Sequence, residues 1–307
     1  MIRTNVIWNI TKACPWTCSF CCVGAKYAHP EEKNYEQKIE RLQNDGTELP
    51  LDLKLRILDH LDTKSLKFDM SGGDPLVIPE NLDVIEQVGK RFGRENNSVT
   101  TTGYCLSRTD QRRLSQSIGL LEFTYDYPYP EDPLRPRGYN TGNLDAVIEM
   151  DTGNIETTAQ APLTTLNTDD QIIRDIYHNL SNAGIDNLLL MEYSDSGRGS
   201  HQDLGLTKGE YVGVAKKYKA LKKKYPLGPK IHLQTPFLPF GEVLFRSLCI
   251  TSSGLLLSNP WAYDSRGNPL DYAVLGDLKD QKLSEICGSN VFTRFVNQAK
   301  SNFYHGK

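Results

Sequence analysis

Short runs rich in β-branched and aromatic residues alternate with amphipathic stretches over most of the chain. Strands are expected at residues 6–10, 66–70, 98–102, 121–126, 155–166, 187–193 and 230–234. Between them, apolar residues recur at helical spacing from Leu82 to Phe92 and from Ile172 to Leu180. Strands that alternate with helices form parallel sheets through right-handed crossovers. The pattern therefore predicts an α/β fold, built as an open or closed barrel.

The alternation ends near residue 235. Residues 235–278 are rich in Pro, Gly and Ser, which indicates irregular structure that contains a hairpin, and a closing helix is expected at roughly residues 281–299. The 307-residue chain is therefore expected to consist of a barrel domain, residues 1–235, and a small carboxyl-terminal appendix, residues 236–307.

Composition excludes several classes of protein. A net charge of −3 and a pI of about 6.1 favour neither nucleic acid nor an anionic membrane as a partner. No apolar run approaches the ~20 residues that cross a bilayer, and the first ten residues do not resemble a secretory signal. The seven cysteines are an odd number, and four lie between Cys14 and Cys22. This arrangement favours a metal site in a reducing, cytoplasmic setting over a disulfide framework.

Three unusual segments directly follow predicted strands. The cysteine cluster follows the first strand, the SGGDP segment (71–75) follows the second, and Gly103 follows the third. In parallel α/β folds the active site lies at the carboxyl ends of the strands. These segments are therefore expected to meet at one rim of the barrel.

The cysteine loop has the spacing CxxxCxxC, formed by Cys14, Cys18 and Cys21. Four cysteines usually hold a [4Fe–4S] cluster, so three thiolates would leave one iron with an open coordination position. A structural zinc site is the alternative, but such sites usually take four ligands from paired knuckles, and a second pair is missing here.

With Phe20 directly before Cys21, this loop resembles the signature of the radical S-adenosylmethionine (radical SAM) enzymes. The resemblance covers roughly residues 5–235 and implies a partial (β/α)6 barrel. It also implies that Cys14, Cys18 and Cys21 hold a [4Fe–4S] cluster, that S-adenosylmethionine chelates the open iron, and that a flavodoxin- or ferredoxin-like protein donates an electron. Radical chemistry of this kind belongs to the cofactor.

Further segments resemble cofactor-binding positions of the same family. Gly72, Gly73 and Asp74 resemble its GGE segment, with Asp in place of the longer Glu, and the resemblance implies that they bind the amino group of the cofactor. Weaker matches imply roles in cofactor binding for Thr102, Thr124, Arg137 and Arg198. For the two arginines, a solvated surface ion pair is the alternative.

The appendix resembles the carboxyl-terminal SPASM or twitch extension of many radical SAM enzymes. It keeps Cys249, Gly254 and hairpin-like hydrophobic residues, but the second cysteine expected near Trp261 is missing. We expect an appendix that has kept this fold and lost its metal. Cys249 is then either a buried packing residue or a thiol that gives a hydrogen atom to a carbon radical. Cys22, Cys105 and Cys287 are expected to pack.

Hydrogen removal on one face and return on the other inverts a stereocentre. With its short chain, an appendix expected to lack a cluster and the isolated Cys249, the sequence resembles the radical SAM aminoglycoside epimerases, which implies a reaction of the type that converts neomycin C into neomycin B. A polycationic sugar requires carboxylates, and Asp126 and Glu192 at strand ends are the candidates, although such acids often only cap a helix.

Two other functions are compatible with the sequence. A peptide maturase or a sugar or cyclitol dehydrogenase would use an auxiliary cluster held through Cys249 and Cys287. Because strand-like sequence begins by residue 6, no leader-binding domain is expected before the barrel, which disfavours the maturase. A non-catalytic iron–sulfur or zinc protein would need neither an open iron nor a cofactor turn.

Overall fold

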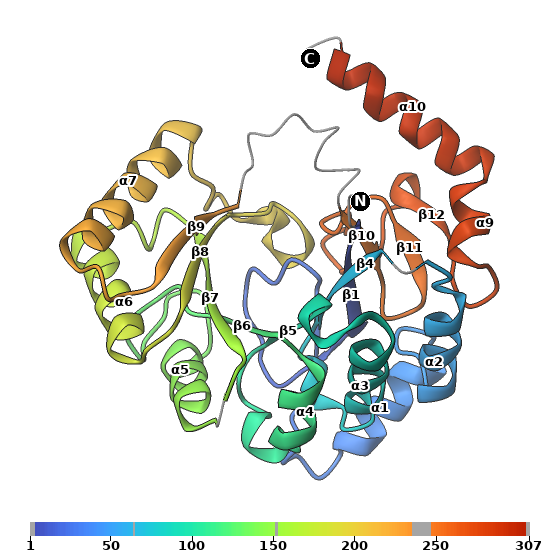
Figure 1. The fold of residues 1–307 in the computed structure, drawn as a ribbon, viewed down its shortest axis with the longest axis horizontal. Coiled ribbons are helices and arrows are strands. Elements are labelled where there is room, and N and C mark those ends of the chain that lie inside the picture. The colour runs from blue at the N-terminus through green and yellow to red at the C-terminus, as the bar shows by residue number, and fades with distance from the viewer. Residues whose placement is uncertain (1–3, 64, 151–152, 235–246, 305–307) are drawn as a thin grey trace.

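A computed structural model describes residues 4–63, 65–150, 153–234 and 247–304. The strands follow an open arc, and helices cover its convex side (Figure 1). One ten-stranded sheet runs in the order β12-β11-β10-β1-β4-β5-β6-β7-β8-β9. Neighbouring strands from β10 to β9 pair in parallel, whereas β11 is antiparallel to both β10 and β12. The predicted α/β fold with a partial barrel is confirmed.

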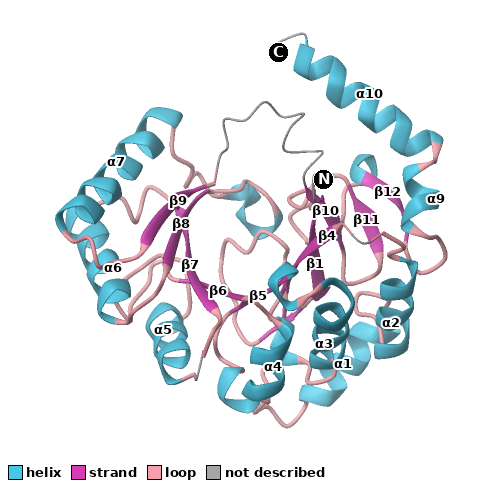
Figure 2. Cartoon of the chain, viewed as in Figure 1, coloured by secondary structure: helices cyan, strands magenta, loops and turns pink. Residues whose placement is uncertain are grey.

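The elements alternate along the chain as Figure 2 shows. The strands are β1 (Thr4–Thr11), β2 (Ala13–Cys14), β3 (Lys26–Tyr27), β4 (Leu66–Gly72), β5 (Asn97–Thr101), β6 (Leu120–Thr124), β7 (Glu156–Leu163), β8 (Asn187–Glu192), β9 (Lys230–Leu233), β10 (Ser247–Ile250), β11 (Leu255–Leu257) and β12 (Val274–Asp277). The α-helices are α1 (Tyr35–Asn44), α2 (Leu51–His60), α3 (Asn81–Phe92), α4 (Gln111–Ser117), α5 (Tyr139–Glu149), α6 (Asp170–Asn182), α7 (Lys208–Lys224), α9 (Leu283–Cys287) and α10 (Asn290–Tyr304). Short 3-10 helices are η1 (Pro75–Val77), η2 (Arg94–Asn96), η3 (Leu106–Arg108), η4 (Gly197–His201) and η5 (Asp271–Ala273).

Strand β1 separates two environments. Val6, Trp8 and Ile10 belong to the hydrophobic core and are at most 1% exposed. Alternate side chains of a strand point to opposite faces, so Ile7 and Asn9 point the other way, into a cavity inside the arc. The sheet thus has one face for the core and one for the cavity.

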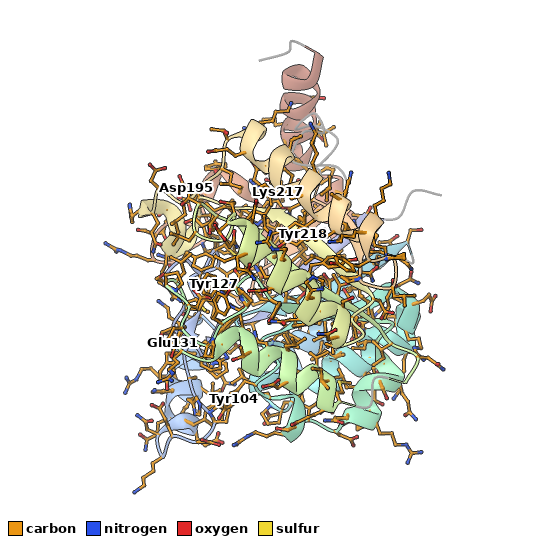
Figure 3. All side chains as sticks on the ribbon, turned by 90° about the vertical axis from the view of Figure 1, so that its left-hand side faces the viewer. Tyr104, Tyr127, Glu131, Asp195, Lys217 and Tyr218 are labelled. Atoms are coloured by element: carbon orange, nitrogen blue, oxygen red, sulfur yellow. The ribbon has the colours of Figure 1, made fainter. Side chains whose placement is uncertain are left out.

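The helices bury the apolar faces that the sequence predicts. Leu82, Ile85, Val88 and Phe92 of α3 are buried, and so are Ile173, Ile176, Tyr177 and Leu180 of α6. On α7, Tyr218 is fully buried, while its neighbour Lys217 reaches the surface and pairs with Asp170 of α6 at 2.6 Å. Figure 3 shows this side of the molecule and labels Lys217 and Tyr218 on the outer layer of helices. No helix in the described ranges is long and apolar enough to span a bilayer.

The carboxyl-terminal strands continue the main sheet. Strand β10 pairs in parallel with β1, with Cys249 opposite Ile7, and then turns into the antiparallel strand β11. The hairpin predicted in this region is therefore present, next to the first strand of the barrel. The division of the chain into two domains at residue 235 stays a prediction.

The closing helix differs from the expectation. Instead of one helix over roughly residues 281–299, the chain forms α9 and α10, separated at Gly288 and Ser289. The Ser289 hydroxyl accepts a hydrogen bond from the backbone N–H of Phe292 at 3.1 Å. A serine in this position caps a new helix, so the break follows from side-chain chemistry rather than from the apolar period.

Candidate active site

The concave side of the sheet encloses a cavity of about 250 Å³. Its walls include the carboxyl ends of strands, as expected for a parallel α/β fold. The predicted site residues that line it are Cys14, Cys18, Phe20, Cys21, Gly72, Gly73, Thr102, Thr124, Glu192 and Arg198. Cys18 and Arg198, which are 180 positions apart in the sequence, therefore line the same cavity.

The three motif cysteines are free thiols on one cavity wall. Cys14 and Cys18 are buried, at 6% and 8% exposure, and Cys21 is half-buried. The backbone N–H of Ala25 donates to Cys21 Sγ at 3.3 Å, and Arg135 Nη1 donates to Cys18 Sγ at 3.5 Å. Donors of this kind stabilise thiolates, which are the form that binds iron.

Burial raises the pKa of the Cys14 thiol well above its usual value, and Asp74 adds to this effect. Burial also raises the pKa of Cys18, against the opposing charge of Arg135. These thiols are protonated as free groups, so metal binding would release their protons.

The donor set fits a cluster better than a single ion. In the described part of the chain, no three His, Cys, Asp or Glu side chains converge closely enough to hold one metal ion. A cubane cluster binds each thiolate at a different iron, so its ligands surround the cluster and need not meet at one point.

Helix η4 holds the cysteine loop in place. Arg198 donates from Nε to the carbonyl of Cys18 at 2.9 Å and from Nη1 to the carbonyl of Ala25 at 2.6 Å. Its backbone N–H donates to the carbonyl of Cys21 at 3.0 Å, and the Ser196 hydroxyl donates to that of Cys22. The cysteine loop forms little regular structure, so its carbonyls are not paired within a helix or a sheet, and these bonds supply partners for them. Arg198 therefore positions the loop, and its expected role in cofactor binding stays a prediction.

The glycine pair at the end of β4, Gly72 and Gly73, allows a close approach to the start of the cysteine loop. A Cβ on Gly72 would lie 2.3 Å from the carbonyl oxygen of Thr11, and the φ of Gly72 is +119°. A Cβ on Gly73 would lie 2.0 Å from the carbonyl oxygen of Ala13. Only glycine fits both positions without a backbone shift.

Asp74 is used differently from the sequence expectation. It is fully buried and does not line the cavity. Its carboxylate accepts from the hydroxyls of Thr101 and Thr102, from the backbone N–H of Thr102, and from that of Leu76, where it caps η1. Asp74 therefore orients Thr102 and the glycine turn, and Thr102 presents the neighbouring polar group to the cavity.

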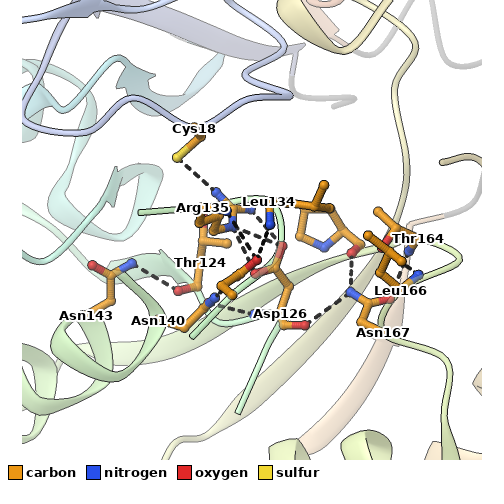
Figure 4. A network of polar contacts seen from close by, with 12 residues as sticks. Cys18, Thr124, Asp126, Leu134, Arg135, Asn140, Asn143, Thr164, Leu166 and Asn167 are labelled. Atoms are coloured by element: carbon orange, nitrogen blue, oxygen red, sulfur yellow. Dashed lines mark hydrogen bonds and ion pairs between the residues drawn. The ribbon is translucent and has the colours of Figure 1, made fainter. Parts of the chain in front are cut away.

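Asp126 and Arg137 do not reach the cavity, whereas Arg135 does. Arg137 is 80% exposed and pairs with Glu131 at 3.1 Å on the surface. Arg135 and Asp126 instead form a buried ion pair, with Nη2 to Oδ2 at 2.7 Å and Nε to Oδ1 at 3.0 Å (Figure 4). The Asp126 carboxylate is thus already neutralised.

Arg135 also packs against aromatic rings. Its guanidinium lies 4.5 Å from the ring centroid of Phe20 and 4.5 Å from that of Tyr139. The segment DPLRPRGYN (132–140) contains two arginines, Arg135 and Arg137. A weak resemblance to the family motif was the only reason to choose Arg137. Arg135 is therefore a site residue that the sequence analysis missed.

Cys249 is fully buried on β10, beside the cavity wall. Because it pairs with Ile7 in parallel register, both side chains point to the same face of the sheet. Asn9 Nδ2 lies 3.5 Å from its Sγ, and the Tyr263 hydroxyl lies 3.6 Å from it. Burial raises the pKa of Cys249 to about 12, so it is a neutral thiol.

The remaining cysteines differ. Cys105 is buried in the core, as predicted, but Cys22 lines the cavity and Cys287 is exposed at the end of α9. Cys249 and Cys287 lie on opposite faces of the sheet. Leu248, the neighbour of Cys249 on β10, lines a pocket together with Cys287, and consecutive side chains of a strand point to opposite faces.

Comparison with protein families gives a match to the 4Fe-4S single cluster domain over residues 4–141, somewhat less than half of the chain. The matched residues include the cysteine loop and the glycine pair. No curated protein matches the sequence.

Solved structures share the fold over almost the whole chain. SuiB of Streptococcus suis, bound to its precursor peptide SuiA, has a TM-score of 0.71 and 12% identity, covering 96% of this chain and 67% of SuiB. SuiB has also been solved with S-adenosylmethionine, at the same score and identity, with 96% and 68% coverage. The enzyme anSMEcpe with bound AdoMet has a TM-score of 0.62 and 15% identity, with 96% and 83% coverage. The fold is that of the radical SAM enzymes.

Proposed function

We propose that this chain is a radical SAM epimerase that inverts one carbon of an aminoglycoside, in a reaction of the type that converts neomycin C into neomycin B. The single observation that supports it most strongly is the placement of two kinds of thiol. Cys14, Cys18 and Cys21 line the cavity, and Cys249 lies beside its wall on the strand next to β1.

The residues at hand fit the two cofactors. Cys14, Cys18 and Cys21 would hold a [4Fe–4S] cluster, and the backbone of Gly72 and Gly73 would approach S-adenosylmethionine, which SuiB and anSMEcpe bind in their solved structures. Bound together, these cofactors supply the removal of a hydrogen atom from an unactivated C–H bond. Phe20, Thr124 and Arg198 line the space around them.

Cys249 would complete the inversion. Its S–H bond breaks homolytically, the hydrogen atom forms a C–H bond on the opposite face of the substrate radical, and a thiyl radical is left on sulfur. One electron and one proton restore the thiol, with the electron coming from a flavodoxin- or ferredoxin-like donor. A buried, neutral thiol is suited to this step, because it carries the hydrogen that must be given away.

The test is an anaerobic reaction of the reconstituted protein with S-adenosylmethionine, dithionite and neomycin C. We expect 5′-deoxyadenosine and neomycin B from the wild type. Cys249→Ala should still form 5′-deoxyadenosine but no neomycin B, and the matched control Cys105→Ala, at another buried thiol, should behave as the wild type.

Inversion at the normal rate in Cys249→Ala would remove Cys249 from the reaction. Formation of 5′-deoxyadenosine by a triple Cys14/Cys18/Cys21→Ala variant would overturn the assignment of the cluster.

A peptide maturase is the second candidate, because SuiB has been solved with a precursor peptide at a TM-score of 0.71. In that case the wild type would cleave S-adenosylmethionine but leave neomycin C unchanged.

A further inference from the structure

A row of polar side chains crosses the concave face of the sheet from β4 to β7. The Thr100 hydroxyl donates to Asp69 Oδ1 at 2.7 Å, and Gln160 Nε2 donates to Glu122 Oε2 at 2.5 Å. Thr100 and Glu122 are register partners on β5 and β6. Asp69, Thr100 and Gln160 line the cavity. The two carboxylates therefore flank Thr100 on the face that the candidate active site occupies.

These two carboxylates are half-buried, and they lack the partners that the fully buried acids of the described chain have. Asp126 is paired with Arg135 at 2.7 Å, Glu48 is paired with Lys54 at 2.5 Å, and Asp74 accepts four hydrogen bonds. Asp69 and Glu122 each accept one hydrogen bond from a neutral donor, and neither forms an ion pair with any residue that the structure describes.

The electrostatic consequence is strong. Burial, and after it the charge of Glu122, raises the pKa of Asp69 to about 7. Burial also raises the pKa of Glu122. Lys67 on β4 lowers both, and Cys249 on β10 also faces Asp69. Two acids that share a poorly solvated region are costly as anions unless a cation joins them.

We propose that Asp69 binds an ammonium group of the substrate at the floor of the cavity, with Glu122 as the second negative charge behind it. This inference rests on the proposed function, since it takes the cavity as the substrate site, and it deepens that function by assigning the carboxylates that recognise an amine. It replaces Asp126, whose charge Arg135 already neutralises, and it adds Asp69 to Glu192, the predicted substrate-binding carboxylate that also lines the cavity.

An amine fits this position better than a metal ion. A divalent cation takes several hard ligands, and the described residues contain no group of three His, Cys, Asp or Glu side chains suited to a metal. An ammonium group has three donors and one charge. It can bind the free oxygen of Asp69 and satisfy neighbouring acceptors such as the hydroxyls of Thr100 and Ser71, which also line the cavity.

The experiment is calorimetric titration of neomycin C into the reconstituted protein with S-adenosylmethionine and no reductant, so that binding is measured without turnover. We compare the wild type with Asp69→Asn, Glu122→Gln and the control Asp280→Asn, which removes an exposed carboxylate far along the chain. We expect Asp69→Asn to weaken binding at least tenfold, Glu122→Gln to weaken it less, and Asp280→Asn to leave it unchanged. Melting temperatures of all variants check that they fold.

Proton release is a second readout that a merely structural residue would not change. An ammonium ion stabilises the ionised form of Asp69, so binding near pH 7 should release protons, and the amount is obtained from titrations in buffers of different ionisation enthalpy. The wild type should release more protons than Asp69→Asn. Equal affinity and equal proton release in the two proteins would overturn the inference while leaving the proposed function intact. No binding of neomycin C to the wild type would overturn both.

Discussion

At the scale of single residues, the site combines paired and unpaired charges. The Arg135 guanidinium and the Asp126 carboxylate form an ion pair, with Nη2 to Oδ2 at 2.7 Å, next to the sulfur of Cys18. Asp69 and Glu122 have no such partner among the described residues, and their anionic forms are therefore disfavoured. Removing one partner of the first pair would leave a buried charge uncompensated, whereas the second pair leaves a carboxyl group that a cationic ligand can ionise.

Replacing Asp69 by Asn should stabilise the protein at neutral and higher pH. The pKa of Asp69 is about 7 in the folded chain and about 3.9 in the unfolded chain. Because the folded pKa is the higher one, the stability that this group contributes is present below pH ~4 and is lost as the pH rises to ~7. Asn still offers a side-chain oxygen to the Thr100 hydroxyl but does not ionise, so it does not lose stability as the pH rises.

The measurement is the melting temperature of both proteins between pH 4 and 8. We expect the difference, variant minus wild type, to become more positive as the pH rises. A difference that does not change with pH would show that Asp69 titrates as an ordinary surface carboxylate.

Removing Arg135 should destabilise the fold, because it leaves Asp126 buried without a counter-charge. Arg135→Ala is expected to cost about 3–5 kcal/mol in the free energy of unfolding. The control Arg137→Ala removes an arginine that is 80% exposed and should change little. Denaturant unfolding of the cluster-free proteins measures both. Similar losses in the two variants would contradict the assignment of the buried pair.

These arginines also show where sequence reasoning loses precision. The family match placed one arginine of the segment 132–140 at the site, and the structure uses the one two positions earlier. The backbone N–H groups of Leu134 and Arg135 both donate to Asp132 Oδ1 and turn the chain so that Arg135 points inward. A local turn of this kind cannot be read from a motif.

At the scale of elements, seven strands of the barrel and the helices α3 and α6 could be predicted, since each carries its own period. The partner of β10 could not. Its pairing with β1 joins residues 242 positions apart at Asn5 and Ser247, and no local pattern specifies which strand it joins. The break between α9 and α10 was also missed, because Ser289 ends an apolar period that would otherwise continue.

The glycine pair at the end of β4 should be intolerant of a side chain. A Cβ on Gly73 would lie 2.0 Å from the Ala13 carbonyl oxygen, so Gly73→Ala must shift β4 away from the cysteine loop. We expect a cost of about 1–3 kcal/mol and weaker binding of S-adenosylmethionine.

The matched control is Gly142→Ala within α5, where an added Cβ meets nothing within 4 Å. It should be neutral or stabilise the protein by up to about 1 kcal/mol. Thermal melting and equilibrium binding of S-adenosylmethionine measure both variants. An unchanged Gly73→Ala would show that β4 and the loop do not need this close approach.

At the scale of the whole molecule, the open arc gathers residues from both ends of the chain around one cavity. The cysteine loop follows β1, η4 holds its carbonyls from the far half of the barrel, and β10 brings Cys249 to the strand beside β1. The sequence predicted the cysteine loop by its place at a strand end, and Cys249 by the resemblance of the appendix to a SPASM or twitch extension. It could not predict Asp69, since a single acid within a strand carries no motif.

The proposed reaction gives the cysteines two roles: Cys14, Cys18 and Cys21 hold one cluster, and Cys249 stays a free thiol. The most direct test is the iron and sulfide content per chain after anaerobic reconstitution, in the wild type, in Cys249→Ala and in Cys14→Ala. We expect about four irons in the wild type and in Cys249→Ala, and loss of the cluster in Cys14→Ala. About eight irons in the wild type, falling in Cys249→Ala, would contradict it, because Cys249 would then be a ligand of an auxiliary cluster.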